Sequence, residues 1–311
     1  MSPAAHAMAT VVRIARNLDR RRLRVAVGIA TAGRPATLAQ VVAELGAQSL
    51  RPEAVVVCAP CAADTAGLSG HPALHILTGP HGLTRQRNAI LDHLDGFDVV
   101  FFFDDDFVPH PRYIEECERL FAGRPDVVMT TGRVASDGIL GPGLTFTEAH
   151  AAIARADPLA GSRPPETVYN AYGCNMGVRL APVRANQIRF DETLPLYGWL
   201  EDVDFSRAVA RHGTILKVPT AVGVHLGIKS GRQSGVRLGY SQIANPLYLV
   251  GKGTCSWRKA AHLMSRNVAA NVVKSVRPEP WVDRIGRVRG NGRALIDLVA
   301  GRISPMRVLG L

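Results

Sequence analysis

The chain has 311 residues and a formal net charge of +11, and 47% of its residues are hydrophobic. This length and composition are enough for a packed core and allow one large α/β domain with an appendage or two modest domains. They exclude a disulfide scaffold, because the five cysteines are irregularly placed, and a membrane-spanning helix, because no apolar stretch approaches the roughly 20 residues required.

The first 24 residues are rich in arginine and nearly free of acidic side chains. Arg13 interrupts the apolar run that a secretion signal needs, so we do not expect secretion. Residues 1–23 are interpreted as a basic, disordered lead-in. The cysteine usage and the missing signal together predict a cytoplasmic protein.

Four short apolar runs at residues 25–31, 54–58, 99–103 and 127–130 have the length and composition of buried strands. They alternate with segments of helical periodicity. This alternation predicts an α/β fold with a mostly parallel, Rossmann-like sheet that carries helices on both faces.

A helix is expected to open near residue 84, where Arg85, Arg87 and Asn88 follow one another closely. The free N–H groups of a helix start attract anions, and arginine binds phosphate through two hydrogen bonds. The alternative is that Arg85 and Arg87 simply lie on an exposed helix face, which has the same sequence pattern. We favour a function for Arg87 and Asn88 because of the acidic group that follows.

The run of phenylalanines at residues 101–103 ends in three consecutive carboxylates, Asp104, Asp105 and Asp106. Adjacent acids repel one another, so a positive partner is expected, and a divalent metal carrying a phosphate is the natural candidate. Pro109 and Pro111 are expected to open the next helix. The carboxylates would then lie at the carboxyl end of a strand, where open α/β sheets bind their ligands.

A second acidic group comprises Glu201, Asp202 and Asp204, just before a helical segment. Acids in the first turn of a helix commonly complement its dipole. Taken alone, this group therefore indicates no chemistry.

The excess of positive over negative charge lies entirely in the C-terminal part of the chain. Residues 227–311 hold 15 Lys or Arg against 3 acids, whereas residues 1–226 hold 22 against 23. Helix-like apolar spacing accompanies this charge and predicts a basic helical extension over residues 227–311. Such a region fits an anionic membrane surface; a solvated arginine-rich face is the alternative. Nucleic acid could also explain the charge, but we expect no nucleic-acid partner.

Seven segments, taken together, resemble family 2 glycosyltransferases in order and rough spacing. They are residues 31–35, 48–52, 87–88, 104–106, 173–177, 190–192 and 198–204. Each is weak alone, and their succession over about 200 residues carries the resemblance. The resemblance implies a GT-A fold over residues 24–226, with a nucleotide-sugar half (24–134) and an acceptor half (135–226).

The resemblance also implies an activity: inverting, metal-dependent transfer of a sugar from a nucleotide-diphosphate donor to a hydroxyl of a glycan or lipid-linked acceptor. It places Mg²⁺ or Mn²⁺ on Asp106 and makes Asp202 the general base. Many relatives have a histidine at the place of His225 that helps the metal or diphosphate, although an isolated histidine after a strand is more often structural. Cell-surface or exopolysaccharide synthesis at the inner membrane face is the expected setting.

The nucleotide is expected to meet several residues. The glycine- and serine-rich loop at residues 227–235 adds two basic side chains that could fold over the diphosphate as a lid; a plain linker is the alternative. The residues expected to bind the nucleotide are Thr31, Arg34, Arg87, Asn88, Asp104, Asp105, Lys229 and Arg232.

The identity of the nucleotide stays open, because residues 58–63 lack the acidic side chains that relatives commonly carry after the second strand. UDP is the default, with dTDP and GDP as alternatives. Two other functions also remain. Asp104 and Asp106 fit the nucleophile loop of a haloacid-dehalogenase-like phosphatase, with Asp104 as the nucleophile, and a basic adaptor could bind nucleotide or membrane without turnover.

Overall fold

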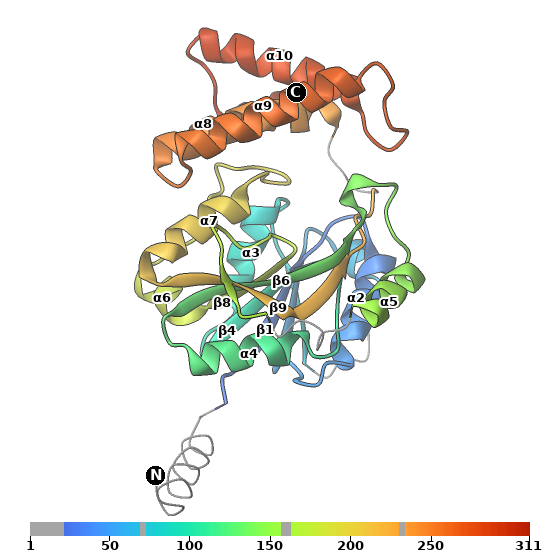
Figure 1. Ribbon diagram of the computed structural model, residues 1–311, viewed down its shortest axis with the longest axis vertical. Helices are drawn as coiled ribbons and strands as arrows, with labels where there is room; N and C mark the ends of the chain where they lie inside the picture. The colour runs from blue at the N-terminus through green and yellow to red at the C-terminus, as the bar shows by residue number, and fades with distance from the viewer. Residues whose placement is uncertain (1–21, 69–72, 157–162, 230–233) are drawn as a thin grey trace, which may run out of the picture.

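The computed structural model describes residues 22–68, 73–156, 163–229 and 234–311 (Figure 1). The expected lead-in lies almost entirely outside these residues, and so does Arg232. The described chain forms a mixed α/β body with a layer of C-terminal helices over one end (Figure 1).

One sheet of nine strands forms the centre of the molecule. Its strands are β1 (Val25–Ala30), β2 (Ala54–Ala59), β3 (Leu74–Thr78), β4 (Val99–Asp104), β5 (Phe107–Pro109), β6 (Val127–Asp137), β7 (Glu166–Thr167), β8 (Asn175–Arg179) and β9 (Thr214–His225). Their order is β3-β2-β1-β4-β8-β6-β9-β5, and β7 pairs with β9. All four strands predicted from the sequence are present, and β6 continues to Asp137, past the expected boundary at residue 134.

The first four strands in this order are parallel, as predicted. β1, β2 and β4 are buried on both faces, which explains why they read as continuous apolar runs rather than alternating ones. The edge strand β3 is partly exposed. Beyond β4 the sheet becomes mixed: β8 runs antiparallel to both β4 and β6, while β6 and β9 are parallel.

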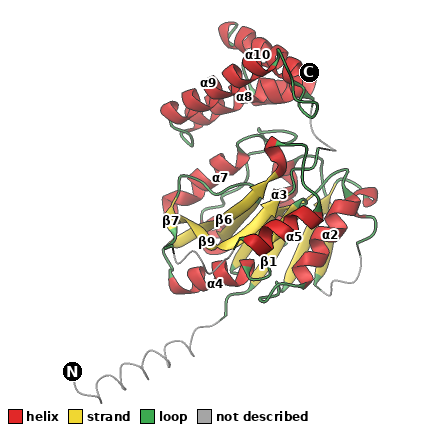
Figure 2. Ribbon diagram, turned by 45° about the vertical axis from the view of Figure 1, so that its right-hand side comes forward, coloured by secondary structure: helices red, strands yellow, loops and turns green. Residues whose placement is uncertain are grey.

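Helices cover both faces of the sheet (Figure 2). They are α2 (Pro35–Gly46), α3 (Leu83–Asp92), α4 (Tyr113–Gly123), α5 (Phe146–Arg155), α6 (Leu180–Ala185) and α7 (Glu201–Val209). Side chains of α2 and α4 belong to the core on one face, and those of α3, α6 and α7 belong to the core on the other. The fold class predicted from the sequence is confirmed.

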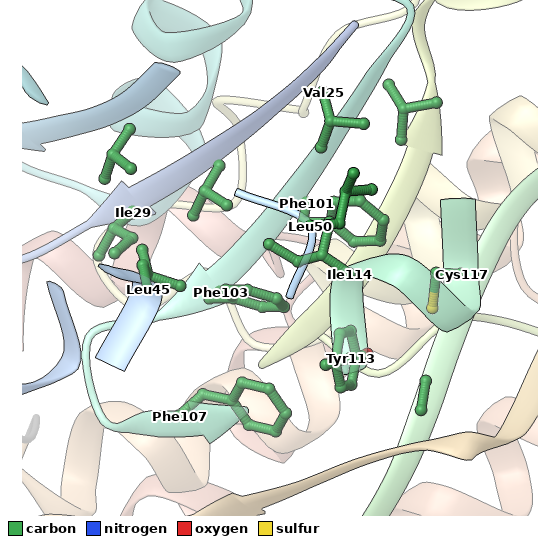
Figure 3. Close-up of a cluster of buried hydrophobic side chains, with 14 of the residues drawn as sticks. Val25, Ile29, Leu45, Leu50, Phe101, Phe103, Phe107, Tyr113, Ile114 and Cys117 are labelled. Carbon is green, nitrogen blue, oxygen red and sulfur yellow. The ribbon is translucent and has the colours of Figure 1, made fainter. Parts of the chain in front are cut away.

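An aromatic cluster lies behind the carboxyl end of β4 (Figure 3). Phe101 and Phe103 point to the same face because side chains two apart in a strand share a face. With Phe107 they surround Tyr113, whose ring meets all three edge-on at centroid distances of 5.3 to 6.3 Å. The Tyr113 hydroxyl donates to the Asn175 carbonyl at 3.0 Å. This packing fixes the strand end that carries the acidic triplet.

The prediction that Pro109 and Pro111 open the next helix was wrong. Pro109 ends the short strand β5, Pro111 lies before the N-cap residue Arg112, and the next helix begins at Tyr113. β5 pairs antiparallel with the end of β9, and Phe107 lies opposite His225. Because neighbouring strands lie about 5 Å apart, this pairing brings the residue before Phe107, Asp106, close to His225.

The chain continues into three helices, α8 (Gly235–Lys252), α9 (Trp257–Lys274) and α10 (Arg284–Val299). Glycines let α8 and α10 approach closely: a Cβ at Gly239 would collide with the Arg287 carbonyl, and one at Gly290 with the Val236 carbonyl. In the part of the chain that the structure describes, no helix is long and apolar enough to cross a membrane.

Candidate active site

The three aspartates after β4 have three different environments. Asp105 is fully buried; it accepts a hydrogen bond from Thr31 Oγ1 at 2.6 Å, and its Oδ1 lies 2.6 Å from Arg34 Nη2. Burial raises the pKa of Asp105, against the charge of Arg34. Thr31 and Arg34 thus lie beside the triplet, and both hold Asp105 in place.

Asp106 is 2% exposed and lies among donors. Its Oδ2 accepts from Arg34 Nη1 at 3.1 Å and from the Ile228 backbone N–H at 2.9 Å, and its Oδ1 lies 3.4 Å from His225 Nε2. Burial alone would raise the pKa of Asp106, but His225 and Arg34 together hold it below its usual range.

His225 is oriented by a carboxylate that the sequence did not single out. Its Nδ1 lies 2.9 Å from Oδ1 of Asp137, at the end of β6, and Asp137 Oδ2 accepts from the Tyr172 hydroxyl at 3.0 Å. Burial would lower the pKa of His225, but Asp106 and Asp137 raise it to about 10. A histidine held through Nδ1 in this way presents Nε2 to a ligand.

Asp104, Asp106 and His225 could hold a metal ion, since each offers one ligand atom and these atoms lie within 4.8 Å of one another. Two carboxylates and an imidazole suit Mn²⁺ and, with less preference for the imidazole, Mg²⁺. The carboxylate behind His225 is the supporting partner that ligating histidines usually have. The donor set therefore fits the expected divalent ion.

Arg87 lies inside the protein rather than on a helix surface. It is 1% exposed, and its guanidinium bonds Asp104 at 3.1 Å, Glu201 at 2.6 Å and the Gly173 carbonyl at 2.8 Å. Phe190 lies against it, with its ring centroid 5.4 Å from the guanidinium carbon. In this arrangement Arg87 joins the end of β4 to the start of α7, instead of pointing at open space for a nucleotide.

Asp202 lies at the start of α7, on the other side of Arg87 from the triplet. Its carboxylate accepts from the backbone N–H groups of Val203 at 2.8 Å and Gly173 at 3.1 Å, and burial raises its pKa. Neighbouring Glu201 pairs with Arg87, and burial raises its pKa to about 8. Two weak sequence signals, the acidic groups near residues 104 and 202, thus meet through one arginine.

Two expected nucleotide ligands have other partners. Asn88 is buried and its amide bonds the Phe190 backbone on both sides, accepting from its N–H at 2.9 Å and donating to its carbonyl at 3.0 Å. Lys229 Nζ donates to the carbonyls of Gly138 at 2.9 Å and Ile139 at 3.1 Å. Asn88 therefore fixes the loop at residue 190, away from the triplet, and Lys229 fixes the chain after His225.

The sequence reasoning also missed a contact between the helical layer and α7. Asp204 is 1% exposed, and its carboxylate binds Lys252 Nζ and Thr254 Oγ1, each at 2.6 Å. Lys252 Nζ also bonds Asp191 at 2.6 Å, as the Tyr248 hydroxyl does at 2.8 Å. Only the spacing of acids in residues 201–204 hinted at a role, and that spacing is ordinary for a helix start.

We expect the Lys252→Met variant to lower the free energy of unfolding by about 1–3 kcal/mol, because two poorly exposed carboxylates lose a charged donor. Urea unfolding followed by circular dichroism measures this change. Lys274→Met is the matched control: among the described residues Lys274 pairs only with Glu279, at 2.7 Å, and it is half exposed, so its loss should cost at most about 1 kcal/mol. Equal effects of the two variants would contradict the assigned importance of Lys252.

No protein-family model matches the sequence, and no curated protein matches it. Solved structures do resemble the fold. TarS from S. aureus, in complex with UDP-GlcNAc, is 14% identical over 92% of this chain and 90% of that one, with a TM-score of 0.54. The mannosyltransferase PcManGT from Pyrobaculum calidifontis, in complex with GDP-Man and Mn²⁺, is 14% identical over 98% and 94%, with a TM-score of 0.52.

GalNAc-T7, with UDP, GalNAc and Mn²⁺, is 12% identical over 92% of this chain and 60% of that one, with a TM-score of 0.50. At these identities the comparison establishes the fold. The fold is that of the GT-A glycosyltransferases, so the GT-A architecture expected from the sequence resemblance is confirmed.

Proposed function

We propose that the protein is a metal-dependent, inverting glycosyltransferase of the family 2 type. The observation that carries this proposal is the link between the two acidic groups. Asp104, Asp106 and His225 form a candidate metal site, and Arg87 connects Asp104 to the helix on which Asp202 lies. A metal site and a carboxylate that can take a proton, held on connected elements, are what the transfer of a sugar from a diphosphate requires.

The proposed donor is a nucleotide-diphosphate sugar. Structures of the same fold hold UDP-GlcNAc, GDP-Man with Mn²⁺, and UDP with Mn²⁺. We propose UDP as the default nucleotide, with dTDP and GDP as alternatives, since residues 58–63 offer no carboxylate to recognise a base. Thr31 and Arg34, in the loop after β1, would border the nucleotide.

Asp106 and His225 would hold Mg²⁺ or Mn²⁺, with Asp104 beside them. A divalent ion there supplies positive charge against the negative charge that grows on the departing diphosphate. Asp137 keeps His225 oriented through Nδ1, and Arg34 and the Ile228 N–H fix the second oxygen of Asp106. These contacts hold the ligand atoms in place before any donor arrives.

Asp202 would act as the general base. As the acceptor oxygen forms its bond to C1 of the sugar, the bond from C1 to the diphosphate breaks on the opposite face, and Asp202 takes the hydroxyl proton. One displacement of this kind inverts the anomeric centre and needs no covalent intermediate. The backbone N–H groups of Gly173 and Val203, which donate to Asp202, orient its carboxylate for this step.

The proposed acceptor is a hydroxyl of a glycan or of a lipid-linked saccharide, in the synthesis of a cell-surface or exported polysaccharide. That acceptor class would place the protein in the cytoplasm, in peripheral contact with the inner face of the membrane. The basic helices over one end of the sheet support this arrangement (Figure 1).

Hydrolysis of a panel of nucleotide sugars with Mn²⁺ tests the proposal without knowledge of the acceptor. We expect slow release of a nucleoside diphosphate from one donor and loss of that release when Mn²⁺ is chelated. Release of inorganic phosphate instead would identify a haloacid-dehalogenase-like phosphatase acting through Asp104. Metal-dependent binding of a nucleotide without any turnover would identify an adaptor.

A further inference from the structure

The exposed large apolar side chains are concentrated near the C-terminus. Fifteen large hydrophobic residues are exposed in the part of the chain that the structure describes, and twelve of them lie between Trp257 and Leu309. Val273, Val276 and Val299 are 71%, 82% and 91% exposed. Single exposed apolar residues are ordinary on a protein surface, but a concentration of them marks an interaction surface.

The outer side of α10 combines apolar and basic residues in one stripe. Ile285, Arg289, Arg293, Ile296 and Val299 are all exposed, and spacings of three and four place them on one side of a helix. The opposite side packs on α8 through the close glycine contacts described above. The stripe is therefore an outward face of the helical layer, because α8 fills the inner side.

The acidic residues of this layer have their direct partners outside the stripe. Glu279 binds Arg284 and Lys274, Asp283 caps the start of α10, and the buried Asp297 binds Arg302 and Arg307 and attracts Arg293 only from a greater distance. Within the described ranges, neither Arg289 nor Arg293 forms an ion pair with a carboxylate. The exposed charge of this face is thus strongly positive.

We propose that the outer stripe of α10, together with Val273 in the last turn of α9 and Val276 just after it, docks on an anionic lipid bilayer. The aliphatic side chains would enter the headgroup region while the arginines meet lipid phosphates, as in interfacial amphipathic helices. A second copy of the chain is a poorer occupant, since two faces of the same positive charge repel each other. Nucleic acid would use the arginines but leave the aliphatic residues without a partner.

Docking here would orient the proposed site. The inner helix α8 contacts the loop before α7: Asn245 Nδ2 donates to the Trp199 carbonyl at 2.7 Å, and Leu196 packs against the cluster of α8 that contains Tyr240. In Figure 2 the helical layer covers the end of the body near α3 and α7. This inference rests on the proposed function, and a membrane at α10 would bring a lipid-linked acceptor toward the helix that begins with Glu201 and Asp202.

Vesicle flotation of the full chain tests the proposal. We expect binding to vesicles of phosphatidylcholine with about 30% phosphatidylglycerol, and much weaker binding to phosphatidylcholine alone. The double variant Ile296→Asp with Val299→Asp should weaken binding about tenfold or more. Independently, Arg289→Gln with Arg293→Gln should weaken it about tenfold or more.

The matched controls are Ile76→Asp, on edge strand β3, and Arg211→Gln, in the turn after α7. Ile76 is 48% exposed and Arg211 is exposed. The two control variants therefore make the same kinds of substitution at exposed positions outside the stripe, and they should bind vesicles as the unmodified chain does. Thermal unfolding checks that every variant is folded. If the aspartate pair unfolds, the glutamine pair still decides the question.

Three results would overturn the proposal: no flotation of the unmodified chain at low salt, unchanged flotation of both stripe variants, or a dimer in solution that the aspartate pair dissociates. Donor hydrolysis in the absence of vesicles is measured on the same proteins and should be unchanged in the stripe variants. A failed membrane contact and a failed glycosyltransferase assignment therefore give different results.

Discussion

The Asp202→Asn variant is expected to lower kcat by about 10²–10⁴-fold while leaving nucleotide affinity nearly unchanged. Asn keeps the size of the side chain, and its single carbonyl oxygen can still accept from one of the two backbone N–H groups, of Gly173 and Val203, that bond the two oxygens of Asp202. It cannot take the acceptor proton. The measurement is transfer or donor hydrolysis under saturating donor, combined with calorimetric binding of the nucleoside diphosphate.

The pH profile gives this prediction a second readout. Burial raises the pKa of Asp202, and a base works only when deprotonated, so kcat should fall on acidification at a pH above the ordinary aspartate value of about 4. That acidic limb should be missing in Asp202→Asn. Asp92→Asn is the matched control, because Asp92 is an exposed carboxylate on α3 that pairs with Arg189; its activity should be unchanged. Loss of nucleotide binding together with rate in Asp202→Asn would contradict the role of a base.

The Asp106→Asn variant is expected to weaken Mn²⁺ binding by about 100-fold or more and to lower kcat/KM by about 10²–10³-fold. The change removes the charge of one candidate ligand but leaves an oxygen for the Ile228 N–H. Electron paramagnetic resonance of Mn²⁺, titrated in the presence of UDP, measures the affinity directly. Because Arg34 loses one anionic partner in this variant, circular dichroism is used to check that the variant is still folded.

Asp137→Asn provides a graded comparison for this second experiment. Asp137 is not among the candidate ligands and acts on the site through Nδ1 of His225, so its effect on Mn²⁺ affinity should be smaller, about 10–100-fold. Equal Mn²⁺ affinity in the unmodified chain and in Asp106→Asn would contradict the assignment of a metal site to Asp106, His225 and Asp104.

Much of the fold could be predicted from local patterns. The runs that became β1, β2, β4 and β6 are apolar over a strand's length and separated by helical periodicity, so they predicted a parallel α/β sheet. The position of Asp104 at the end of β4 followed from the abrupt change from phenylalanine to aspartate. Such signals lie within a few residues of one another and need no knowledge of tertiary contacts.

The supporting contacts of the site could not be predicted in the same way. The pairing of β5 with β9 joins Phe107 to His225 across more than a hundred residues, and the short sequence of β5 carries no signal for it. Arg87 had the pattern of an exposed helix start, yet packing on Phe190 and pairing with Asp104 and Glu201 bury it. In both cases tertiary context overrode the local pattern.

The helical layer shows a similar limit. Its positive charge was plain from the sequence, but the apolar residues of α9 and α10 had spacings that also fit a core-facing helix. Packing decides which of them are covered: Ala294 of α10 is fully buried in the cluster that contains Tyr240 of α8, whereas Ile296 remains 59% exposed. A count of hydrophobic residues cannot separate these two outcomes.

The bond from Lys252 to Asp204 determines which part of this chain can fold as a unit. A fragment ending after β9 would keep every proposed catalytic side chain, yet it would leave Asp204 without its cation and uncover Leu194, which packs against Leu249 of α8. Burying an unpaired carboxylate and exposing a leucine both favour loosening of α7. The smallest stable unit therefore includes α8, and a library of truncations should retain the chain through Thr254.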